Sequence, residues 1–148
     1  MAGPGYVGSR HTGRCLCGQV TLAIAADPLG ARQCWCRDCQ YLASGSPTVN
    51  VLFPEEAVRY SGEVSTLRMV ADSGNTVERG FCPGCGTQLY SRTLEPKGQP
   101  MRVRAGTLDN RDVLPPQSYI WVSSAPDWAS FDPALPKFSK GPGSDPVA

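Results

Sequence analysis

Seven cysteines in three short clusters carry the strongest chemical information in this sequence of 148 residues. Thiolates spaced one or two residues apart are typical of protein zinc sites, because neighbouring sulfurs can wrap one ion. The clusters are Cys15-Leu-Cys17-Gly18, Cys34-Trp-Cys36-Arg-Asp-Cys39 and Cys82-Pro-Gly-Cys85-Gly86.

Two other interpretations of the cysteines were weighed against zinc binding. A mixture of disulfides and buried apolar cysteines is disfavoured by the odd number of cysteines and by their tight clustering. A redox-active pair at Cys82 and Cys85 belongs at a strand-to-helix junction, whereas the residues after Gly86 have the pattern of a strand. We therefore interpret all seven cysteines as metal ligands.

Two of the clusters end in glycine, which lets the backbone turn so that both sulfurs face one ion. Cys82 and Cys85 form one such pair, and Cys15 and Cys17 form a shorter one. Together the two pairs predict a closed, structural zinc site with four thiolates that joins distant parts of the chain.

The remaining cysteines, Cys34, Cys36 and Cys39, predict a second zinc with an open fourth position. The only histidine, His11, is expected to be a solvated residue rather than a ligand. Three thiolates make zinc a weak Lewis acid that is well suited to an additional thiolate. We therefore expect a catalytic centre at these three cysteines and a small thiol as its substrate, with Asp38 as the nearest candidate base.

The segments between the cysteine clusters mostly alternate apolar and polar residues, with a period of two. Short alternating runs bounded by turn-forming residues predict an all-β fold of small antiparallel sheets. The expected strands lie within residues 20–24, 49–53, 67–71, 76–81, 87–90, 101–105 and 119–122, and one short helix is expected at 37–42. Composition at the ends predicts a flexible arm at residues 1–10, a single zinc-binding domain at 11–132 and a flexible tail at 133–148.

Composition limits the partners and the cellular location that we expect for the protein. A net charge of +1, with 18% charged residues, is ordinary for a globular domain and gives no support to a nucleic-acid partner. The sequence shows neither an apolar run long enough to cross a membrane nor a leader peptide. We expect a cytoplasmic protein, and the sequence leaves its oligomeric state open.

The order of the motifs resembles the glutathione-dependent formaldehyde-activating enzyme family, also named for centromere protein V. The three cysteine clusters are followed by Gly-Thr-Leu-Asp at 106–109 and by a tryptophan-containing segment at 120–128. The resemblance implies a β-tent fold, with a structural zinc on Cys15, Cys17, Cys82 and Cys85 and a second zinc on Cys34, Cys36 and Cys39. It also implies a carbon–sulfur lyase that forms S-(hydroxymethyl)glutathione from glutathione and formaldehyde.

The middle cluster departs from the family pattern, in which a histidine and a following basic pair are common. Here Trp35 lies between the first two cysteines, and Gln40-Tyr41 follow the third. We expect substrate contacts from four residues: Trp35 at the pocket mouth, Arg37 on a carboxylate, and Gly45 and Ser46 through backbone N–H groups. The alternatives to an enzyme are a non-catalytic thiol-binding module and a zinc-stabilised interaction protein.

Overall fold

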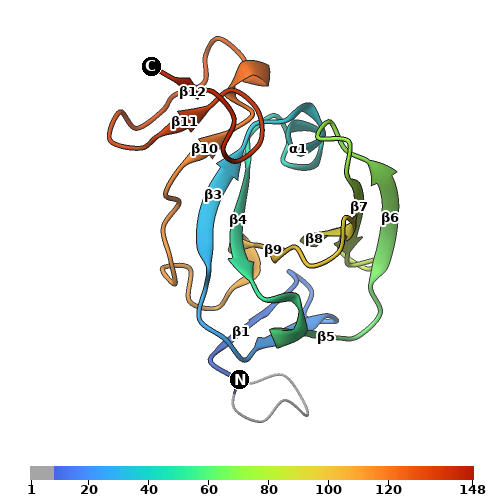
Figure 1. Cartoon of the computed structure of the whole chain (residues 1–148). Helices are drawn as coiled ribbons and strands as arrows, with labels where there is room; N and C mark the ends of the chain where they lie inside the picture. Colours follow the sequence, from blue (N-terminus) through green and yellow to red (C-terminus); the bar gives the residue numbers. More distant parts are fainter. Residues whose placement is uncertain (1–8) are drawn as a thin grey trace.

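The computed structural model describes residues 9–148 and is mainly β, which confirms the predicted fold class (Figure 1). Its α-helix, α1 (Arg37–Leu42), begins and ends where the sequence predicted. Most of the expected N-terminal arm, residues 1–8, lies outside the described residues. No helix within residues 9–148 has the length and hydrophobicity that a membrane crossing requires.

The strands form two sheets. The smaller sheet has the order β1-β2-β5 and is antiparallel, with strands β1 (His11–Arg14), β2 (Thr21–Ile24) and β5 (Val58–Ser61). The larger sheet has nine strands in the order β12-β11-β10-β3-β4-β9-β8-β7-β6. Its strands, in chain order, are β3 (Gly30–Cys34), β4 (Thr48–Phe53), β6 (Ser65–Val70), β7 (Thr76–Phe81), β8 (Gln88–Glu95), β9 (Met101–Arg104), β10 (Tyr119–Ile120), β11 (Lys137–Phe138) and β12 (Pro146–Val147).

The larger sheet curls so that β3 and β4 lie opposite β6 and β7. In Figure 1, β3 and β4 lie on one side, β6 and β7 on the other, and α1 covers the top between them. Most neighbouring strands are antiparallel, but β10 pairs in parallel with both β3 and β11. This curl allows side chains from opposite ends of the sheet to share one cavity.

Alternation along β4 and β9 divides the two faces of the sheet. Val51 and Phe53 on β4 and Val103 on β9 are buried in the main hydrophobic core. The residues next to Val51 and Val103, Asn50 on β4 and Arg104 on β9, line the cavity instead. Because successive side chains of a strand point to opposite faces, one short sequence supplies both core and cavity.

The C-terminal segment contains a pair of short strands. Residues 133–148, which we expect to form a flexible tail, include β11 and β12, and these two strands pair in an antiparallel way. The flexibility of the segment stays a prediction. The turn between β11 and β12 is closed by bonds from Ser139 N to Asp145 O (2.9 Å) and from Lys140 N to Ser144 Oγ (2.9 Å). The glycines and prolines that suggested a tail serve in this turn, where Gly143 has a φ of +78°.

Candidate metal centres and the adjoining cavity

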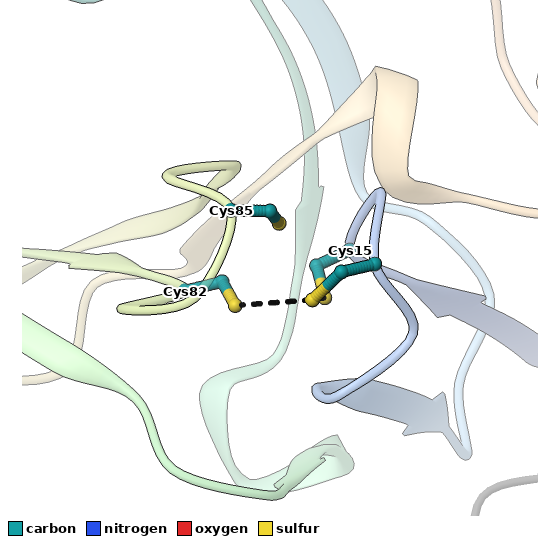
Figure 2. Close-up of side chains that lie close together, drawn as sticks. Cys15, Cys82 and Cys85 are labelled. Carbon is teal, nitrogen blue, oxygen red and sulfur yellow. Dashed lines mark hydrogen bonds between the residues drawn. The ribbon is translucent and has the colours of Figure 1, made fainter.

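The first cysteine cluster joins two turns, one between β1 and β2 and the other between β7 and β8. Figure 2 shows Cys15 on one turn and Cys82 and Cys85 on the other, with their sulfurs directed into one space. Together with Cys17, all four sulfurs lie within 4.8 Å of one another.

The sulfur separations fit a zinc ion and not a disulfide. Cys17 Sγ lies 3.6 Å from Cys15 Sγ and 3.7 Å from Cys82 Sγ. A tetrahedral zinc with Zn–S bonds of about 2.3 Å places its sulfurs about 3.8 Å apart. A disulfide bond would need about 2.05 Å. The four-cysteine cluster therefore has the donors and the spacing for a closed metal centre.

Glycine and threonine shape the turns of the four-cysteine cluster. Gly18 (φ +80°) and Gly86 (φ +76°) follow the cysteine pairs and adopt the left-handed conformation that glycine tolerates best. The Thr87 hydroxyl accepts a hydrogen bond from Leu16 N (3.1 Å) and lies 3.1 Å from Cys85 Sγ, so it connects the two turns. Hydrogen bonds from the side chain and then the backbone of Thr87 lower the pKa of Cys85 to about 5, which favours the thiolate that a metal binds.

The second cluster forms where β3 meets α1. Cys34 ends β3, Cys36 is the N-cap of α1, and Cys39 lies in the helix. All three are buried, and their sulfurs lie within 4.8 Å of one another. The Cys36 sulfur accepts a hydrogen bond from Cys39 N (3.3 Å). Helix capping therefore brings two of the candidate metal-ligating cysteines together. The predicted division into four-cysteine and three-cysteine clusters is confirmed.

The charges of the three-cysteine cluster call for a cation. Hydrogen bonds with Cys34 and Cys36, followed by the Thr48 hydroxyl at 3.0 Å, lower the pKa of Cys39 to about 2. Hydrogen bonds with Cys36 and Cys39 in turn raise the pKa of Cys34. The three sulfurs therefore compete for negative charge. A divalent ion would supply the charge that three adjacent thiolates need.

A cavity of about 180 Å³ opens beside this cluster and is lined by all three of its cysteines. Four arginines from the curled sheet, which we call the arginine cluster, share the lining: Arg32, Arg79, Arg102 and Arg104. The sequence analysis did not single out any of them. The signal that could have identified two of them is the alternation Met101-Arg-Val-Arg104 in the expected strand at 101–105, which places Arg102 and Arg104 on one face.

The C-terminal segment forms part of the rim of this cavity. Gly141 and Pro142, from the turn between β11 and β12, line it together with Trp121. The backbone of Trp121 is left-handed (φ 58°), which is unusual for a bulky residue, and its N–H donates to Lys140 O at 2.8 Å. The turn between β11 and β12 therefore helps to position Trp121 in the cavity wall.

Two of the predicted substrate contacts are engaged elsewhere. Trp35 is buried and packs edge-on against Trp128 and Phe131, with ring centroids 6.2 and 6.0 Å away. Arg37 stacks over the Tyr41 ring at 4.9 Å and is also hydrogen-bonded to Gln40. Neither residue is among the described residues that line the cavity. Their contact with a substrate stays a prediction.

The other candidates lie around α1. Gly45 and Ser46 form the turn after the helix, outside the described cavity lining, so their role also stays a prediction. Asp38 Oδ2 lies 3.7 Å from Arg79 Nη2 and thus faces the arginine cluster. His11 belongs to neither described cysteine cluster, and its half-buried ring packs against Phe53 at 5.7 Å.

These features define a mainly β protein with two cysteine clusters that could hold metal ions, one of which faces a polar cavity. The chain belongs to the glutathione-dependent formaldehyde-activating enzyme family, whose match covers residues 10–124. The resemblance read from the cysteine motifs is thereby confirmed.

A solved structure supports the fold. The crystal structure of a Rhodobacter sphaeroides protein, a structural-genomics target, superposes on the chain with a TM-score of 0.54. The two sequences are 17% identical, and the match covers 71% of this chain and 96% of that one. At this identity the likeness concerns the fold alone.

Proposed function

We propose that this protein is a cytoplasmic, zinc-dependent carbon–sulfur lyase that forms S-(hydroxymethyl)glutathione from glutathione and formaldehyde. The observation that carries the proposal is that Cys34, Cys36 and Cys39 all line the cavity. Family membership supports glutathione and formaldehyde as the substrates.

The two clusters would divide the work. The four-cysteine cluster would hold a structural zinc that ties the β1–β2 turn to the β7–β8 turn. The three-cysteine cluster would hold the second zinc, which in such a site keeps a substrate sulfur in the thiolate form at neutral pH. Around it, Thr48 orients Cys39 through its hydroxyl, and α1 fixes Cys36 and Cys39 relative to each other.

The reaction needs no oxidant or reductant. The thiol loses its proton, and its sulfur lone pair forms a bond to the carbon of formaldehyde. The carbonyl π electrons move to oxygen, which takes up a proton, so thiol and aldehyde combine into a hydroxymethyl thioether. The reverse step breaks the same carbon–sulfur bond, which is lyase chemistry.

Metal analysis and an exchange measurement test this proposal together. Protein purified under reducing conditions is expected to hold zinc in both clusters, and Cys36→Ser to lose only the ion of the three-cysteine cluster. Magnetisation-exchange NMR with ¹³C-formaldehyde and glutathione then measures adduct formation. Wild-type protein is expected to accelerate it, whereas Cys36→Ser should leave it at the rate of buffer.

Other outcomes would change the assignment. Unchanged zinc content and unchanged acceleration in Cys36→Ser would refute it. A thiol that binds the wild-type protein without faster adduct formation would indicate a non-catalytic thiol-binding module. Two zinc ions with no response to any thiol would indicate a structural or interaction protein.

A further inference from the structure

The cavity beside the three-cysteine cluster carries an excess of positive charge. Among the described residues, its lining holds the four guanidinium groups of the arginine cluster and one carboxylate, that of Asp72. One zinc ion with three thiolates would add a single negative charge. The cavity therefore remains positive even when the metal centre is complete.

Two arginines of the cluster keep unused donors although they are buried. Arg79 and Arg104 are only 6% and 7% exposed. Within residues 9–148, Nε and Nη1 of Arg79 and Nε of Arg104 find no hydrogen-bond partner. Buried N–H groups are rarely left unpaired, so these atoms point to a ligand that completes them.

Arg102 and Arg104 are hydrogen-bonded to neutral side chains. Arg102 donates to the hydroxyls of Ser91 (2.7 Å) and Thr93 (3.2 Å), and Arg104 donates to the side-chain oxygen of Asn50 (2.5 Å). These contacts orient the guanidinium groups without neutralising them. Burial first, and then the nearby arginines, lower the pKa of Arg102 to about 10.

The chain pairs a comparable arginine differently when the role is structural. Arg92, also on the larger sheet, binds Glu55 at 2.9 Å and Glu78 at 2.7 Å. In the arginine cluster, the Asp38 carboxylate is 3.7 Å from Arg79. The contrast favours a cluster arranged to receive an anion from outside.

We propose that the arginine cluster selects the substrate by binding the carboxylates of an acidic thiol whose sulfur lies at the three-cysteine cluster. This inference rests on the proposed function of that cluster and names the residues that would determine its specificity for carboxylate-bearing thiols. Arg79 and Arg104, with their unused donors, are the specificity-determining residues. A planar guanidinium matches a carboxylate through two parallel hydrogen bonds, which a neutral ester cannot reproduce.

The test compares glutathione with its diethyl ester, which keeps the peptide and the thiol but removes both carboxylate charges. Binding to zinc-loaded protein is measured by titration calorimetry for the wild type, Arg79→Gln and Arg111→Gln. Arg111 is exposed and outside the described cavity lining, so its variant controls for the loss of one positive charge.

We expect the wild type to bind glutathione at least about tenfold more tightly than the diester. Arg79→Gln should lose about tenfold for glutathione and almost nothing for the diester, since only the charged hydrogen bonds are removed. Arg111→Gln should match the wild type. A loss in Arg79→Gln that affects glutathione but not the diester also shows that charge, and not the added bulk of the ester groups, causes the preference.

Equal wild-type affinities for the two thiols would overturn the inference, as would an equal loss for both in Arg79→Gln. If Arg79→Gln does not fold, Arg102→Gln, which changes a half-buried residue of the same lining, takes its place. The formaldehyde exchange assay, run in parallel, separates the two proposals. Charge selectivity without faster adduct formation would refute only the proposed function, and faster adduct formation without selectivity would refute only this inference.

Discussion

Replacing one threonine beside each cysteine cluster should loosen one metal and spare the other. Thr48 is buried, and its hydroxyl donates to Cys39 Sγ at 3.0 Å. Thr87 is half-buried, and its hydroxyl lies 3.1 Å from Cys85 Sγ in the other cluster. Valine keeps the branched shape of threonine and removes only the hydroxyl. The two variants therefore serve as controls for each other.

The magnitude follows from what each hydroxyl contacts. A hydrogen bond to a charged group contributes about 1.5–3 kcal/mol, and Thr48→Val removes one from a thiolate. The same change leaves Asn50 Nδ2 without its acceptor at 3.1 Å, but that loss is common to metal-free and metal-loaded protein. It should lower stability without altering metal affinity. We expect Thr48→Val to weaken metal binding at the three-cysteine cluster by about 10–100-fold, and Thr87→Val to weaken the other cluster by less because Thr87 is more exposed.

Zinc transfer to a chromophoric chelator measures both sites in one experiment. The wild type should release zinc in two phases, and Cys36→Ser, which retains only the four-cysteine cluster, assigns them. Thr48→Val should accelerate only the phase absent from Cys36→Ser, and Thr87→Val only the other phase. If Thr48→Val accelerated both phases equally, or neither, the hydroxyl would not act on Cys39 in the way the geometry indicates.

Three further changes test the frame around the site. Cys82→Ser should lower the thermal unfolding midpoint by scanning calorimetry far more than Cys36→Ser, because only the four-cysteine cluster joins two distant turns; equal midpoints would contradict this. Glu78→Gln should lower the free energy of unfolding by about 2 kcal/mol at pH 7, since Glu78 accepts hydrogen bonds from Arg92 and Tyr90. Because Arg92 holds the pKa of Glu78 below its usual range, this contribution is complete above pH of about 4.3 and is lost as the pH falls through the lowered value, so urea titrations of both proteins should converge in acid. Gly13→Ala should destabilise more than Gly84→Ala in the same titrations, because a Cβ at 13 would meet the Thr107 backbone oxygen, whereas one at 84 would meet the movable Gln19 amide.

The two cysteine clusters could be predicted because the spacing within each pair is local. Cys36 and Cys39 meet through one turn of helix, and Cys82 and Cys85 through one turn of backbone, so short-range geometry determines each pair. The strands with clear alternation, such as β4 and β7, were found for the same reason. Conversely, β1, β3 and β5 were not predicted. HTGR and GARQC lack an apolar alternation, and VRYS alternates over only four residues, so these strands depend on pairing with their neighbours.

The arginine cluster shows what local patterns could not provide. Arg32 and Arg104 are far apart in the sequence, and both pair with Asn50 because β4 lies between β3 and β9. Arg79 faces the cavity because Ser91 connects it in register with Arg102 across β8. Strand order is set by long-range pairing, and no spacing along the chain encodes it. The sequence therefore pointed to Arg37, next to the cysteines, whereas the sheet brings four other arginines to them.

The same strand pairing connects the four-cysteine cluster to the wall of the cavity beside the three-cysteine cluster. Arg79 lies on β7, and that strand runs directly into the turn that holds Cys82. Cys34 and Arg32 lie on β3, on the far side of the curled sheet. A metal that fixes Cys82 to the β1–β2 turn therefore also restrains the strand that carries the cavity's most deeply buried arginine. Under the proposed function, the four-cysteine cluster would define the cavity wall, and the three-cysteine cluster would define where in that cavity a sulfur binds.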